Sequence, residues 1–229
     1  MSSYRNSSAR KVFDPIRFTT REANIRFNAR EAFAAACAAQ RVNGEYLKQG
    51  EYDEQGDQKR IANKYLTLDF LNSKFDIRDE DRELSEHVIR HFQSLTFKIL
   101  QGDILSEFES KAMAYSNSED VGLFEIGLIS SLPSCYLRNE AKAVVNRRIR
   151  DAVGHIGQVG DKVQLELEVL RCTHSQQWDT FFITGITPDN KSVFFSFKRL
   201  IAKGTTMNIE GKVKAHRDDS TQLNYVRVM

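Results

Sequence analysis

The pattern of hydrophobic and polar residues along the chain changes period once, near residue 154. Before that point, apolar residues recur at spacings of three and four, as on one face of a helix. After it, apolar and polar residues alternate, for example from Lys162 to Arg171, as in a half-buried strand. Residues 154–160 (GHIGQVG) contain three glycines and mark the expected domain boundary. The pattern therefore predicts an α+β protein, with a helical domain over residues 19–153 and a small five-stranded β-barrel over residues 158–229.

The N-terminal part of the helical domain carries clear start and stop signals. Residues 1–18 are polar and predict a loose arm. Thr19–Glu22 fits a capping box, in which the threonine accepts a backbone N–H and the glutamate reaches back. The helix that it opens should run to about Val42 and end at Gly44. Residues 45–60 are charged and poor in aliphatic side chains, which indicates a mobile surface loop.

Further helices are expected downstream. Residues 61–75 fit either a helix or a strand, and helix is favoured. Residues 79–100 give the clearest helical pattern, with acidic side chains at the N-terminus, where the helix dipole stabilises them. Shorter helices are predicted over 104–115, 121–131 and 136–153.

Aromatic residues are concentrated in two of the predicted strands, Trp178–Thr184 and Ser192–Arg199, which flank a turn at Pro188–Lys191. Alternation places the neighbouring phenylalanines of each strand on opposite faces, so one can fill the barrel while the other points outward. An outward aromatic either stacks on nucleic-acid bases, at roughly 1–3 kcal/mol per base, or lies beneath the N-terminal helices. The pattern leaves both alternatives open. Trp178 follows a polar segment and is expected at an exposed loop edge.

Cations accompany these aromatic residues. Alternation puts Lys212, Lys214 and His216 on one face of a later strand, where they can track a phosphate backbone. Such a row is usually a solvated outer face, but its association with the phenylalanines favours binding. The predicted nucleic-acid-binding residues are Trp178, Phe182, Phe195, Lys198, Arg199, Lys212, Lys214, His216, Arg217 and Tyr225. Arg147, Arg148 and Arg150 form a secondary basic set, which the dipole of the helix that they end also explains.

The composition narrows the class of protein. The 229 residues include 33 basic and 31 acidic side chains, a net charge of +2 that excludes a histone-like polycation. The three cysteines are far apart, and the chain has no Cys-x-x-Cys pair, so neither a disulfide framework nor a structural zinc site is expected. No cofactor is predicted. No apolar run approaches the ~20 residues of a membrane helix, and the N-terminus lacks the hydrophobic segment of a secretory signal. A cytoplasmic protein is expected.

The sequence contains no convincing pattern of catalytic residues, and we do not predict an enzyme. His87 and His91 stand four residues apart but lack the glutamate of a His-Glu-x-x-His metal motif. The acidic residues 79–83 are explained by a helix N-terminus without a metal. Residues 154–160 precede a strand and lack the Lys-Ser/Thr that ends a phosphate-binding loop.

Two segments of the chain resemble parts of known protein families. Residues 208–217 (NIEGKVKAHR) followed by 221–228 (TQLNYVRV) resemble the end of OB-fold nucleic-acid-binding domains in the replication and recombination proteins of tailed phages. The helical part, including residues 92–100 (FQSLTFKIL), looks like phage accessory proteins without an assigned mechanism. The resemblance implies an OB-like barrel and a setting in phage DNA metabolism, in the host cytoplasm.

The sequence therefore predicts a protein that binds single-stranded nucleic acid, DNA favoured over RNA, without catalysis. The helices would supply a docking surface for a protein partner or for self-association. Two alternatives remain open: a protein–protein adaptor that uses the barrel and the helices, and a nuclease or repair accessory with a carboxylate site in the helices.

Overall fold

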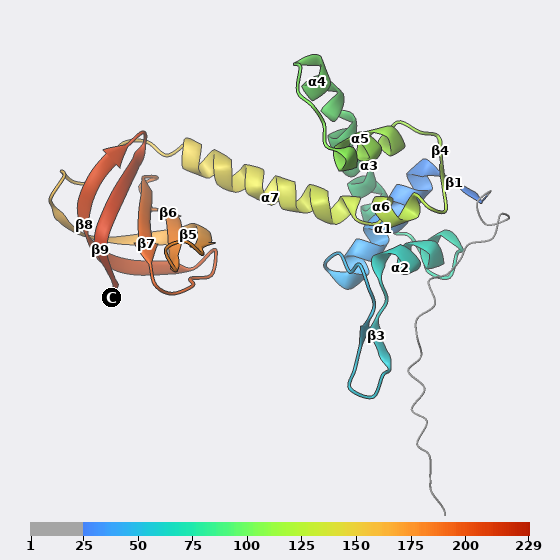
Figure 1. The fold of residues 1–229 in the computed structure, drawn as a ribbon, viewed down its shortest axis with the longest axis horizontal. Helices are drawn as coiled ribbons and strands as arrows, with labels where there is room; N and C mark the ends of the chain where they lie inside the picture. Colours follow the sequence, from blue (N-terminus) through green and yellow to red (C-terminus); the bar gives the residue numbers. More distant parts are fainter. Residues whose placement is uncertain (1–24) are drawn as a thin grey trace, which may run out of the picture. The chain divides into compact units, whose positions relative to one another are not determined.

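The computed structural model describes residues 25–229, and the chain divides at Leu137/Arg138 into two compact units (Figure 1). Unit 1 ends with Leu137 and unit 2 comprises Arg138–Met229. The division falls within a helix, N-terminal to the glycine-rich boundary predicted at residues 154–160. The predicted arm at residues 1–18 and the predicted capping box at Thr19–Glu22 lie outside the described residues.

Unit 1 is built from short helices with two small pairs of strands. Its helices are α1 (Ala29–Asn43), α2 (Asn63–Leu71), α3 (Asp79–Gln93), α4 (Leu95–Leu100), α5 (Glu107–Ser116), α6 (Ile126–Ile129) and the beginning of α7 (Leu132–Arg150). Strand β1 (Arg26–Asn28) pairs with β4 (Asp120–Gly122), and β2 (Glu51–Tyr52) pairs with β3 (Gln58–Arg60), both antiparallel.

Helix α1 forms the centre of unit 1, because its alanines are all buried and α2 and α3 pack against it. The helix predicted from Thr19 is wrong at its start: Asn28 is the N-cap, and its side chain accepts a hydrogen bond from the Glu31 backbone N–H at 3.2 Å. The end at Gly44 is confirmed, since this glycine adopts the left-handed conformation (φ 73°) that closes many helices. The surrounding core includes Phe33 and Phe92.

The other helices of unit 1 follow the predictions in type but not always in length. The loop predicted at residues 45–60 contains the β2–β3 hairpin, and the ambiguous segment 61–75 holds α2. The single helix predicted over 79–100 is interrupted at Ser94, which separates α3 from α4. The helices predicted over 104–115, 121–131 and 136–153 correspond to α5, α6 and α7. No helix of residues 25–229 has both the length and the apolar character needed to cross a membrane.

Unit 2 contains a closed five-stranded barrel in the order β5-β6-β7-β9-β8. The strands are β5 (Lys162–Ser175), β6 (Thr180–Ile186), β7 (Ser192–Phe197), β8 (Thr206–Arg217) and β9 (Ser220–Val228). The β7–β9 pair is parallel and every other pair is antiparallel. This closed barrel is compatible with an OB-like fold. The predicted fold class, helices followed by a five-stranded barrel, is confirmed.

The interior of the barrel is filled by alternate residues of all five strands. The fully buried members are Leu167, Val169, Ile183, Val193, Phe195, Ile209, Val213 and Leu223. Gly185 lies where β6 crosses β5 closely: a Cβ atom there would be 2.9 Å from the Glu168 carbonyl oxygen, so only glycine fits.

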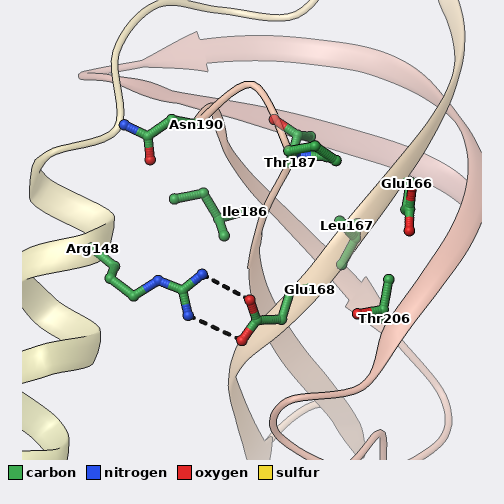
Figure 2. A pocket seen from close by; sticks show the side chains of 9 residues that line it. Arg148, Glu166, Leu167, Glu168, Ile186, Thr187, Asn190 and Thr206 are labelled. Carbon is green, nitrogen blue, oxygen red and sulfur yellow. Dashed lines mark hydrogen bonds and ion pairs between the residues drawn. The ribbon is translucent and has the colours of Figure 1, made fainter.

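The C-terminal half of α7 packs on the outside of this barrel. Val145 and Ile149 contact a small cluster that contains Leu170 and Ile186. Beside it, the Arg148 guanidinium donates two hydrogen bonds to the Glu168 carboxylate, at 3.0 and 2.7 Å (Figure 2). Leu170 faces the helix because β5 has an irregularity between Val169 and Arg171. The Arg148–Glu168 pair and the apolar cluster together fix the helix to the barrel.

The Arg148–Glu168 pair makes this attachment sensitive to acid. Hydrogen bonding from Arg148 lowers the pKa of Glu168 below its ordinary value. The stabilisation is therefore fully present above the ordinary glutamate pKa of about 4.3 and is lost as the pH falls through the lower pKa of the folded state. Because the two side chains are 42% and 36% exposed, solvent screening limits the effect to about 0.5–1 kcal/mol.

We expect Glu168→Gln to speed amide hydrogen exchange over residues 145–153 by about two- to fivefold at pH 6, because part of the attachment is lost. The difference from wild type should shrink as the pH falls below the ordinary glutamate pKa, because Glu168 is then protonated progressively. Glu166→Gln is the matched control: Glu166 is exposed two residues earlier on the same strand face and lies in no ion pair within residues 25–229. Equal exchange rates in all three proteins at pH 6 would contradict a role of the Arg148–Glu168 pair in attaching α7.

Candidate nucleic-acid interface

Three aromatic side chains form a continuous patch on the outer wall of the barrel. Trp178 lies in the turn between β5 and β6, Phe182 on β6 and Phe194 on β7. The Trp178 and Phe182 rings meet edge to face with centroids 5.7 Å apart, and the Phe182 and Phe194 rings stack with centroids 5.7 Å apart and planes inclined by 26°. We call these three residues the aromatic patch. Trp178 is 62% exposed, in agreement with its predicted position at a loop edge.

Strand register explains why the patch faces outward. On β6, Ile183 is buried in the core, so its neighbours Phe182 and Thr184 point away from it. Thr184 pairs with Phe194, which places Phe194 on the same outer side as Phe182. The second and third strands of an OB-type barrel, with the loop between the first and second, are the face on which such folds bind oligonucleotides. The aromatic patch occupies these elements.

Phe195, predicted as a binding residue, is instead part of the barrel core. Its side chain is fully buried and its ring packs edge-on with Phe197. The residue that reaches the surface is its neighbour Phe194, which the prediction missed. Alternation required one of the two to point outward, but only the register of β7 against β6 and β9 decides which one.

Lys198 and Arg199 are exposed directly after β7. The last residue of that strand, Phe197, pairs with Phe181, so the two cations leave the barrel at the end where the β5–β6 turn carries Trp178. Arg217 is exposed at the other end, before the β8–β9 turn. Lys198 and Arg199 therefore lie at the Trp178 end of the aromatic patch, whereas Arg217 lies on β8, which β9 separates from β7.

Lys212 and Lys214 are exposed on β8, as alternation predicts, and we call them the lysine row. Strand β9 lies between β8 and β7, so the row occupies a different sector of the wall from the aromatic patch. Lys212 faces Lys162 of β5 across the sheet. Tyr225 lies near the row: it is highly exposed and adopts a left-handed backbone conformation (φ 54°), at an irregularity where β9 passes Glu210 and Lys212.

His216 does not belong to the lysine row. A register shift between Val213 and Ala215 interrupts the alternation, and the imidazole of His216 stacks on that of His155 with centroids 4.2 Å apart and planes inclined by 2°. Its Nε2 atom is buried. The predicted position of His216 on the same strand face as the two lysines is therefore wrong, because the irregularity turns its side chain onto the segment that leads into the barrel.

The secondary basic set is divided by the structure. Arg147 is exposed, and Arg150 lies 3.6 Å from the Asp151 carboxylate. Arg148 is held by Glu168, whose hydrogen bond also raises the pKa of the guanidinium. Arg148 therefore contributes to the attachment of α7 to the barrel, a role that the sequence did not predict.

The residues considered for catalysis have structural partners. The His91 ring contacts Phe92 and Tyr136, with centroids 5.0 and 5.3 Å away. Asp81 accepts hydrogen bonds from Arg41 at 2.8 and 2.9 Å and from the Arg78 backbone N–H at 3.0 Å, so the carboxylate fixes the start of α3. In the part of the chain that the structure describes, no group of three His, Cys, Asp or Glu side chains gathers where it could hold a metal ion.

Comparisons with protein-family models, with curated proteins and with solved structures found no match to this chain. The candidate interface therefore rests on its geometry: an outward-facing aromatic patch on an OB-like barrel, with exposed Trp178 and the cations Lys198 and Arg199 at one end.

The neighbouring phenylalanines of β7 give a matched test of which face is buried. Phe195→Ala removes a fully buried ring and should lower the free energy of unfolding by about 3–5 kcal/mol. Phe194→Ala removes one stacked partner on the surface and should cost only about 0.5–1.5 kcal/mol. Guanidinium unfolding followed by the fluorescence of Trp178, the only tryptophan, reports on this barrel. Equal losses in the two variants would contradict the register.

Proposed function

We propose that this protein binds single-stranded nucleic acid, DNA favoured, on the outer wall of its barrel and without catalysis. The observation that carries the proposal is the aromatic patch, which faces outward on the strands and loop with which OB-type barrels bind oligonucleotides. The three outward-facing rings have no role in the barrel core, since Ile183 and Phe195 already fill the inner side of the same strands.

The chemistry of the patch suits unpaired bases. A base offers its π-face only when it is free of a duplex, and each base that stacks on an aromatic side chain contributes roughly 1–3 kcal/mol. Lys198 and Arg199 place positive charge at the Trp178 end of the patch, where phosphates of a bound strand would pass. Stacking and phosphate contacts both tolerate sequence, so we propose binding without sequence preference. A role in phage DNA metabolism, in the host cytoplasm, belongs to the same proposal and rests on the sequence resemblance alone.

A protein–protein adaptor is the second candidate, and one observation favours it. Helix α4 projects from the rest of unit 1 (Figure 1), and Phe97, Leu100 and the following Ile104 are 66%, 76% and 97% exposed. Large apolar side chains gathered on a surface are typical of an interaction site. The two candidates separate in one experiment, because only the first requires salt-dependent binding to oligonucleotides.

We expect labelled dT oligonucleotides to bind and log K to fall with log[salt], at a slope of about −0.7 per phosphate contacted. Fluorescence anisotropy with dT, rU and duplex oligonucleotides across a salt series measures this, and the duplex should bind more weakly than either single strand. Binding that is absent at low salt would reject the proposal and favour the adaptor.

Trp178→Ala should weaken dT binding by roughly 1–3 kcal/mol, because one stacking surface is lost, and the wild-type tryptophan emission should be quenched on binding. Stability should change little, since the side chain is mostly exposed. Phe97→Ala is the matched control: it removes an aromatic side chain of similar exposure (66% against 62%) from unit 1. An equal loss of affinity in both variants would place the effect outside the patch.

A further inference from the structure

A groove of about 310 Å³ lies between α7 and β5 in unit 2. Four basic residues line it: Arg138 and Lys142 from α7, Arg171 from β5 and Lys203 from the segment between β7 and β8. Leu170 and Val145 supply apolar surface, and no carboxylate is among the lining residues. We call these four cations and the space between them the basic groove. Lys142 and Lys203 were not singled out by the sequence, because they are separated by some sixty positions.

The two lysines of the basic groove, Lys142 and Lys203, have no acidic partner in the described part of the chain. Arg148, further along the same helix, shows the contrast, since Glu168 neutralises it. Several like charges around one concave space repel one another and create a positive potential that attracts an anion.

The guanidinium of Arg171 is held in place at the groove. One of its terminal nitrogens donates to the Asn146 side-chain oxygen at 2.5 Å. A guanidinium carries five N–H donors in a fixed plane, so the others remain for an oxyanion, and a planar donor set suits phosphate. The groove therefore contains an oriented arginine as well as lysines on flexible stems.

Strand register places the basic groove beside the aromatic patch. Arg171 pairs with Thr184 of β6, and Thr184 pairs with Phe194 of β7. Two neighbouring-strand spacings of about 4.8 Å separate Arg171 from Phe194, so their backbones lie roughly 10 Å apart. Two residues further along β5, Thr173 pairs with Phe182 of β6. The patch and the groove are therefore consecutive on one outer surface.

We propose that the basic groove is a phosphate-binding site, and that it takes the phosphates of the single strand whose bases stack on the aromatic patch. The second part rests on the proposed function. The strand then crosses the barrel from β7 over β6 and β5 towards α7, rather than over β9 to the lysine row. Helix α7 thus serves as one wall of the interface.

Two double variants test whether the bound strand runs to the basic groove or to the lysine row. Lys142→Ala/Lys203→Ala and Lys212→Ala/Lys214→Ala each remove two exposed lysines, so the change in net charge is the same. In dT anisotropy titrations, we expect the groove variant to bind more weakly and its salt slope to shrink by about 1.4, two contacts at about 0.7 each. The row variant should match wild type. Wild-type affinity in the groove variant, or equal losses in both, would overturn the inference.

A titration with tripolyphosphate separates the groove from the proposed function. In wild type, the anion should shift the NMR signals of the Asn146 side-chain amide and of the Leu170 and Arg171 backbone amides, and the groove variant should lose these shifts. If wild type binds no dT but shows the shifts, the proposed function fails and the phosphate site stands. If tripolyphosphate leaves these signals unchanged, the phosphate site is overturned whatever dT does.

Discussion

Closure of the barrel by the parallel pairing of β7 with β9 decides which side of every strand faces the core. Val193 and Phe195 of β7 pair with Thr221 and Leu223 of β9, and all four are buried. Once that interior is full, the alternate residues of the same strands have no core to enter. Phe194 is held at the surface for this reason, and Phe182 is held there by the burial of Ile183 on β6. The position of the aromatic patch thus depends on the closure of the barrel as well as on the aromatic residues in its strands.

The second constraint is the irregularity in β5 between Val169 and Arg171. It turns Leu170 outward, where α7 covers it, and lets Arg171 point outward as well. Without this extra residue, strict alternation would place one of the two in the barrel. The same short segment therefore supplies the apolar contact that fixes the helix and the cation that faces the basic groove. The attachment of α7 and the formation of the basic groove therefore both depend on this irregularity in β5.

Periodicity was enough to predict the fold class, because the change from helical spacing to alternation is a local property of the chain. Two other local signals, a glycine and a polar segment, predicted the helix end at Gly44 and the exposure of Trp178. It failed wherever the answer depends on distant pairing. Alternation could not choose Phe194 over Phe195 without the register of β7, and it placed His216 on the wrong side of a bulge. The helix start was wrong because residues 26–28 pair with a strand some ninety positions away.

The charged residues of the sequence likewise did not predict the basic groove, because its cations come from distant parts of the chain. The basic groove and the lysine row also differ in how their cations are held. The net charge of +2 does not predict where unneutralised positive charge lies on the surface. Arg148 forms an ion pair with Glu168, whereas no carboxylate is among the residues that line the basic groove. The two lysines of the row are exposed and have long flexible side chains, so contact with a phosphate orders them at an entropic cost. Arg171 is already oriented by Asn146 and partly walled by α7, so less freedom is lost when an oxyanion arrives. Preorganisation therefore favours the groove over the row, even though the row is the more conspicuous pattern in the sequence.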